Sequence, residues 1–132
     1  MRQGSNTSRR PRRRAATRWP SPYRRFGLIA AIASLVLVFV MVSMLNVHWY
    51  IAWIMGWSVV TLLFYGWDKQ QSRQNGQRVP EFILHSLALV GGFPGGWLGR
   101  ALFRHKTRHT SFLVVLIVST LFHAGLVWWM WR

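Results

Sequence analysis

The sequence contains no cysteine and only two acidic residues in 132. Without cysteine, a disulfide framework, a thiolate nucleophile and a cysteine metal site are all excluded. Long stretches also lack charge of either sign: no Lys, Arg, Asp or Glu lies between Arg25 and Asp68, or from Thr110 to Trp131. Uncharged apolar runs of about 18 residues or more are typical of membrane-spanning helices. These absences favour an all-α, polytopic membrane protein.

Apolar and basic residues dominate the rest of the composition. Hydrophobic residues make up 52% of the chain, with nine Trp and eight Phe, which is more apolar surface than a soluble core of this size can hide. Seventeen Lys and Arg against two acids give a formal net charge of +15. In a membrane protein, an excess of basic residues indicates how the protein is oriented in the membrane, because basic loops stay in the cytoplasm. We therefore expect a multi-pass protein with its N-terminus and its basic segments in the cytoplasm.

The first 25 residues hold nine Arg and no acid. Such a segment cannot bury enough apolar area to fold, so we expect residues 1–25 to be a disordered cytoplasmic tail and residues 26–132 to be the membrane domain. A basic residue near a membrane contributes about 1 kcal/mol of attraction to anionic lipid. Lipid headgroups are the expected partner, and nucleic acid is the weaker alternative. The arginines concerned are Arg9, Arg10, Arg12, Arg13 and Arg14.

Three apolar runs are long enough to cross a bilayer: residues 26–45, 49–67 and 111–131. The first exceeds the hydrophobic part of a cleaved signal peptide, so it should be an uncleaved anchor. Only residues 46–48 separate the first two runs, which predicts an antiparallel hairpin. Within the second run, Trp49, Trp53 and Trp57 recur every four residues and lie on one helix face. We expect this face to contact lipid or to pack against another helix.

A fourth apolar segment, residues 80–104, is interrupted in its middle by Gly91, Gly92, Pro94, Gly95 and Gly96. Gly costs about 1 kcal/mol and Pro about 3 kcal/mol in a helix interior. If this segment crossed the membrane, the basic residues after it would face outside, against the positive-inside bias. We therefore predict two half-helices, Pro80–Val90 and Gly95–Arg104, that form a re-entrant hairpin. Its turn should pack against the hairpin of the first two helices rather than against lipid. The alternative is four spans, with the C-terminus in the cytoplasm.

Four motifs lie in order between Tyr65 and Phe112: Tyr-Gly-Trp-Asp-Lys, Arg-Val-Pro-Glu, Gly-Gly-Phe-Pro-Gly-Gly and His-Lys-Thr. This series closely resembles domain-of-unknown-function family 1294, small bacterial integral membrane proteins. The resemblance implies a bacterial membrane protein, for which we expect the cytoplasmic (inner) membrane, and it implies no activity. Some family members carry a cold-shock, nucleic-acid-binding domain where this chain has its arginine-rich tail. The family positions are Asp68, Lys69, Arg78, Pro80, Glu81, Gly91, Gly92, Gly95, His105, Lys106 and Thr107.

Asp68 and Glu81 are the only carboxylates, and both lie among basic residues. Cations on all sides should keep them ionised and paired. One interpretation is a set of structural ion pairs that hold helix ends together. The other is a polar site in which a carboxylate moves a proton, with Asp68, Glu81, His85 and His105 as catalytic candidates. An anionic headgroup or phosphate would be bound there by Lys69, Arg78, Arg104, Lys106 and Thr107.

Glu81 and His85 are four residues apart and would lie on the same helix face. In that arrangement they could act as an acid/base pair or as two metal ligands. No third ligand of suitable type is at hand, so we predict neither a metal nor a cofactor. His123, in the middle of the last run, is a functional candidate by its position in the membrane. The preferred interpretation is a neutral imidazole bonded to Ser119 or Thr120.

These residues leave three hypotheses for function. We favour a structural or regulatory protein, without catalysis, whose basic cytoplasmic face binds a partner or an anionic lipid. The second is a membrane enzyme that acts on a lipid or lipid-linked anion. The third is a small transporter in which the broken segment forms the binding element, and a chain this short would then form a homo-oligomer.

Overall fold

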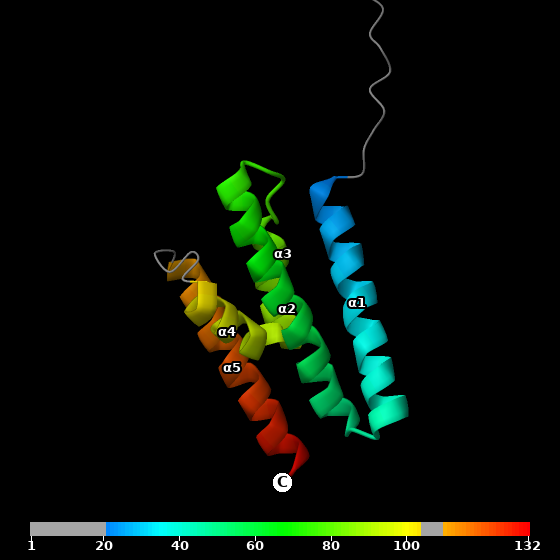
Figure 1. Cartoon of the computed structure of the whole chain (residues 1–132). Helices are drawn as coiled ribbons and strands as arrows, with labels where there is room; N and C mark the ends of the chain where they lie inside the picture. The colour runs from blue at the N-terminus through cyan, green and yellow to red at the C-terminus, as the bar shows by residue number, and fades with distance from the viewer. Residues whose placement is uncertain (1–20, 104–109) are drawn as a thin grey trace, which may run out of the picture.

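The computed structural model describes residues 21–103 and 110–132, and the regular structure in these ranges is entirely helical (Figure 1). The elements are α1 (Pro22–Leu45), α2 (Trp49–Gln74), α3 (Glu81–Leu87), η1 (Ala88–Gly92), α4 (Phe93–Phe103) and α5 (Thr110–Met130). By length and composition, four helical segments can cross a membrane: α1, α2, α5 and the combined segment Glu81–Phe103. The prediction of an all-α, polytopic membrane protein is confirmed.

α1 and α2 form an antiparallel hairpin (Figure 1). α1 begins four residues before the predicted run because Pro22 suits the first helical turn, where no N–H partner is required. Asn46 ends α1 in the left-handed conformation, with φ of 51°. The two helices approach closely where Gly56 of α2 meets α1, since a Cβ on Gly56 would lie 3.2 Å from the Ser34 carbonyl oxygen.

α2 extends to Gln74, seven residues past the end predicted for the second membrane span. Residues 68–74 are helical because Lys, Gln and Arg are good helix formers and a helix can continue beyond the bilayer. The helix ends at Asn75, which has φ of 51°. The connection between α2 and α3 is therefore limited to residues 75–80.

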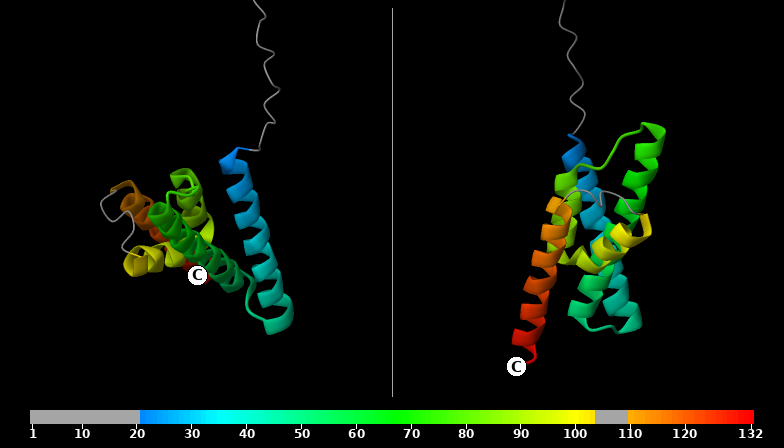
Figure 2. Two further views of the ribbon diagram at one scale, coloured as in Figure 1. Left: turned by 45° about the horizontal axis from the view of Figure 1, so that its top comes forward. Right: turned by 90° about the vertical axis from the view of Figure 1, so that its left-hand side faces the viewer.

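The broken segment turns back at Gly91, whose φ of 151° is available to glycine and strongly disfavoured for other residues. α3 starts beside Asp68 of α2 and descends along that helix until Val90 reaches Trp53. α4 then returns, so that Phe103 lies against Gly66 and Lys69. Both ends of the segment thus lie at the same end of the bundle (Figures 1 and 2). The segment thus folds back on itself as a hairpin, the shape predicted for a re-entrant segment, and does not form one straight helix.

The break is more compact than the predicted Gly-Gly-Phe-Pro-Gly-Gly turn. Gly91 alone leaves helical geometry, and Phe93 already belongs to α4. Pro94 is compatible with helix because it falls in the first turn of α4, where its missing N–H would have no partner in the helix. Gly95 and Gly96 are helical for a different reason, which is close packing.

Neighbouring helices satisfy the backbone around the break. The Trp53 indole of α2 donates to the Val90 carbonyl at 2.8 Å, and the Ser119 hydroxyl of α5 donates to the Ala88 carbonyl at 2.6 Å. Peptide groups at membrane depth need such partners because lipid offers none. The break therefore packs between α2 and α5, as expected for a turn covered by protein.

Glycines of α4 allow its backbone to approach two helices. A Cβ on Gly95 would collide with the Ser58 backbone, and one on Gly99 would lie 2.9 Å from Cβ of Tyr65, so both glycines face α2. Gly96 faces α5 instead, where its added Cβ would lie 2.5 Å from a Leu116 methyl group. Small residues at this spacing let helices in membranes pack closely by van der Waals contact.

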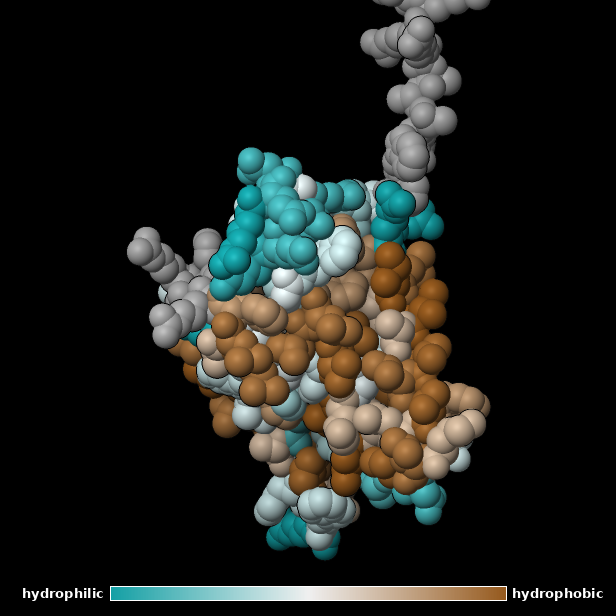
Figure 3. All heavy atoms as spheres, viewed as in Figure 1, coloured by the Kyte–Doolittle hydropathy of each residue, from teal (hydrophilic) through white to brown (hydrophobic). Residues whose placement is uncertain are grey.

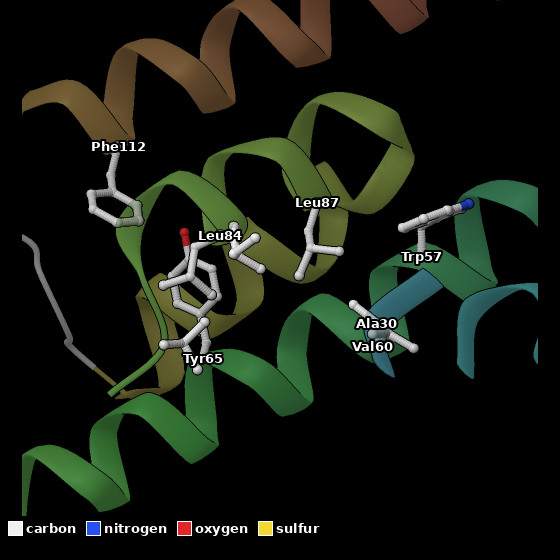
Figure 4. Close-up of a cluster of buried hydrophobic side chains, with 9 residues drawn as sticks. Ala30, Trp57, Val60, Tyr65, Leu84, Leu87 and Phe112 are labelled. Atoms are coloured by element: carbon white, nitrogen blue, oxygen red, sulfur yellow. The ribbon is translucent and has the colours of Figure 1, made fainter. Parts of the chain in front are cut away.

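The buried core lies where the broken segment meets α2 and α5. Figure 4 shows Tyr65 and Val60 of α2 beside Leu84 and Leu87 of the broken segment, with Phe112 approaching from α5. Outside this core the surface is apolar: Figure 3 shows a broad hydrophobic band between hydrophilic caps at the two ends of the molecule. A soluble protein does not expose such a band, and a lipid-facing one does.

Candidate functional site

Two neighbouring residues of α2 hold the two ends of the re-entrant hairpin. Asp68 accepts a hydrogen bond from the backbone N–H of Val79, just before α3 begins. Lys69 donates through Nζ to the carbonyl of Phe103, the last residue of α4. A free carbonyl at a helix C-terminus is a favourable partner for a cation. We call Asp68 and Lys69 the anchor pair, because each fixes one end of the hairpin to α2.

Asp68 is fully buried, with 0% of its surface exposed. Its Oδ1 lies 3.1 Å from the Val79 nitrogen and 3.7 Å from Nε of Arg78. The Arg78 side chain is 52% exposed, so water screens this ion pair and its contribution to stability is small. The hydrogen bond to Val79 is the stronger constraint, since a buried N–H without a partner costs about 1–3 kcal/mol.

Tyr65 lies one turn before the anchor pair, at the point where four helices meet. It is 1% exposed, its ring packs edge-on against Phe112 of α5 at 6.1 Å, and Gly99 of α4 packs against its Cβ. Tyr65 therefore connects the anchor pair to the hydrophobic core (Figure 4).

Glu81 and His85 both lie on α3. Glu81 is exposed in the first turn, where a carboxylate is favoured by the helix dipole. The ring of His85 packs against Phe112, with 4.3 Å between ring centroids. Among the described residues, no group of three His, Cys, Asp or Glu side chains is placed to hold a metal ion.

Basic side chains gather at the end of the bundle that carries the anchor pair. This basic end is formed by the start of α1, the end of α2, the connection to α3 with the start of that helix, and the end of α4 (Figure 1). These segments carry Arg24, Arg25, Lys69, Arg73, Arg78 and Arg100, together with the two acidic residues Asp68 and Glu81. In the described part of the chain, Arg132 is the sole Lys or Arg at the other end. The hydrophilic cap of the basic end covers the end of α2 and the start of α1 in Figure 3.

The structure brings Asp68, Lys69 and Arg78 together at the basic end and places His123 elsewhere. His123 is buried at mid-depth in α5, and its Nδ1 donates to the Ser119 carbonyl at 2.9 Å, the residue one turn earlier. Its ring stacks 5.1 Å from that of Phe93. Four further candidates, Arg104, His105, Lys106 and Thr107, lie outside the described residues, as do the arginines of the tail.

Three residues that organise the hairpin were absent from the predicted site: Trp53, Tyr65 and Ser119. Tyr65 opens the first of the four motifs, which is a signal for its role. Trp53 and Ser119 have no distinguishing signal, because their carbonyl partners are 37 and 31 residues away in the chain.

Comparisons with known proteins agree with the motifs. Residues 58–112 match the family described as "Protein of unknown function (DUF1294)". A segment of 47 residues is 47% identical to "Uncharacterized protein YsdA" of Bacillus subtilis (strain 168). This alignment covers 36% of the chain and 53% of that relative, so the chain matches about half of the relative's length. No solved structure matches the chain. The resemblance to family 1294 is thus confirmed, and the matching residues, 58–112, contain both members of the anchor pair and the whole re-entrant hairpin.

Proposed function

We propose that this is a multi-pass protein of the bacterial cytoplasmic membrane whose basic end faces the cytoplasm and binds an anionic headgroup or phosphate, in a structural or regulatory role. The observation that carries the proposal is the charge at this end: it carries six described cations and two carboxylates, and Asp68, one of the two, is buried against Val79 and Arg78. The cations therefore exceed the anions that the described residues offer them. Arginine and lysine in excess favour phosphate and anionic headgroups.

The same charges support the orientation. Basic residues near helix ends are retained in the cytoplasm. With the basic end inside, α1, α2 and α5 cross the bilayer, the hairpin enters and leaves from the cytoplasmic side, and Arg132 lies outside. Aromatic residues near the ends of these helices, where interfacial Trp and Tyr are favoured, agree with this layout: Trp49, Trp67, Trp128, Trp129 and Trp131.

Binding is better supported than catalysis by Asp68. A general base must reach the proton of a substrate, whereas Asp68 is fully buried and accepts a hydrogen bond from the protein's own backbone. Transport through the break is also less well supported. Discontinuous helices coordinate ions through free backbone carbonyls, but the Ala88 and Val90 carbonyls already accept hydrogen bonds from Ser119 and Trp53.

A soluble headgroup analogue tests the proposal. The full chain, in nanodiscs of zwitterionic phosphatidylcholine, should unfold at a higher temperature when glycerol 3-phosphate is added, and salt should weaken this effect. The double variant Arg73→Gln/Arg78→Gln should lose most of the increase, whereas Met44→Gln, an exposed position at the other end, should keep it. No increase in the unmodified protein, or an equal increase in the double variant, would refute binding at the basic end.

A further inference from the structure

The end of the bundle opposite the basic end contains a groove of about 720 Å³. The groove lies between the first turns of α2 and the last turns of α5. Its apolar walls are Ile51, Ile54 and Met55 on one side and Ala124, Val127 and Trp128 on the other. Phe93 and His123 also line it, so it extends inward to the level of the re-entrant tip. This volume falls within the range of roughly 300–1,000 Å³ typical of ligand pockets.

Two polar groups distinguish this groove from a plain lipid-facing surface. The hydroxyl of Tyr50, which lines the groove, is buried and has no hydrogen-bond partner among residues 21–103 and 110–132. The guanidinium of Arg132, also in the lining, lies 4.9 Å from the ring of Trp128. The two acidic side chains, Asp68 and Glu81, are both at the basic end. Arg132 at the mouth therefore has no acidic side chain to pair with.

We propose that the groove binds an anionic phospholipid, with one acyl chain against its apolar walls and the phosphate on Arg132. Arginine binds phosphate through several N–H donors in a fixed geometry, and stacking on Trp128 holds the guanidinium in place. The Tyr50 hydroxyl can donate to an ester or phosphate oxygen. This site is separate from the basic end and is exposed to the other leaflet of the bilayer.

Charge favours a lipid over a second copy of the chain in this groove. In a two-fold symmetric dimer, the interface is formed by the same surface of both subunits. Two Arg132 side chains would then meet in an apolar interface without a described acid to neutralise them. An anionic phosphate removes this repulsion, and a hydrocarbon chain matches the walls.

Native mass spectrometry of the full chain, released from nanodiscs of mixed phosphatidylglycerol and phosphatidylcholine, tests the proposal. The unmodified protein should retain phosphatidylglycerol in preference to phosphatidylcholine. Ala124→Trp fills the groove and should lower the retained phosphatidylglycerol at least severalfold. Ala101→Trp places the same side chain on an exposed position of α4 and should leave it unchanged. Arg132→Gln should reduce the preference for phosphatidylglycerol about fivefold, the factor that corresponds to the attraction of one basic residue.

Equal retention of the two lipids by the unmodified protein would overturn the proposal. So would equal retention of phosphatidylglycerol by the Ala124→Trp and Ala101→Trp variants. A third overturning result is a lipid-free dimer that Ala124→Trp converts to monomer, because the groove would then be an interface between copies. Circular dichroism of each variant verifies that it is folded, and Arg132→Gln, which changes an exposed terminal residue, tests the phosphate contact without altering the walls.

Discussion

The Trp53 indole and the Val90 carbonyl, 37 residues apart in the chain, form a 2.8 Å hydrogen bond across the helix interface. Val90 immediately precedes Gly91, where the helix breaks. On the opposite side Ser119 donates to Ala88. The two bonds satisfy carbonyls on both faces of the break, and so allow a bent helix to lie inside an apolar environment.

Replacing Trp53 with Phe should destabilise the fold. The Val90 carbonyl would lose its donor while the aromatic packing is largely kept, so we expect a cost of about 1–2 kcal/mol. Unfolding by SDS in mixed micelles, followed by circular dichroism, measures the difference. Trp49→Phe is the matched control, because Trp49 is 56% exposed. Equal stability of the two variants would show that the bond to Val90 contributes nothing.

Gly95→Ala should also destabilise the protein, here by overpacking. A Cβ at Gly95 would overlap the Ser58 backbone of α2, which cannot move away as a flexible side chain can. Overpacking of this kind costs about 1–3 kcal/mol. Gly125→Ala provides the control, because nothing lies within 4 Å of its added Cβ and Ala favours helix. In the same unfolding assay, Gly125→Ala should be at least as stable as the unmodified protein. A Gly95→Ala variant that is as stable as Gly125→Ala would contradict the packing described for α4.

Asp68→Ala should weaken the start of the hairpin more than Asp68→Asn. Alanine leaves the Val79 N–H buried without an acceptor, at a cost of about 1–3 kcal/mol. Asparagine keeps an oxygen in that position and loses the negative charge that pairs with Arg78. Hydrogen exchange at the amide of Val79 is the sensitive measurement, with Glu81→Gln as a control at an exposed carboxylate. If exchange at Val79 were as slow in Asp68→Ala as in the unmodified protein, the anchoring role of Asp68 would be wrong.

Much of the architecture could be predicted because one signal, the absence of charge over long runs, is strong in a membrane protein. The glycines and Pro94 indicated where the fourth segment breaks, and the charges after it indicated the direction in which it continues. The extent of the break could not be predicted, because a Gly-Gly-Phe-Pro-Gly-Gly sequence is equally compatible with an open turn and with one bent residue. The packing of Gly95 against Ser58 and of Gly96 against Leu116 determines how far the break extends. Both contacts join residues that are distant in the sequence.

The charged residues of the candidate site could be predicted from the sequence, but the contacts that each of them makes could not. Asp68 and Lys69 were identified as neighbours among cations, but nothing in the sequence shows that one of them bonds to Val79 and the other to Phe103. The apolar groove carries even less signal. Its walls come from residues 48–55 and 120–132 together with Phe93, and each of these segments alone reads as an ordinary membrane helix.

The side of the membrane on which each loop lies is the most direct test of the central claim, that the hairpin enters and leaves at the basic end. The chain has no cysteine, so single variants Asn46→Cys, Asn75→Cys, Lys106→Cys and Arg132→Cys can be labelled with a membrane-impermeant maleimide in intact cells and in inverted vesicles. We predict that positions 75 and 106 react only in inverted vesicles and that positions 46 and 132 react in intact cells. Labelling of position 106 in intact cells, with position 75 protected, would mean that the broken segment crosses the membrane and would contradict the account.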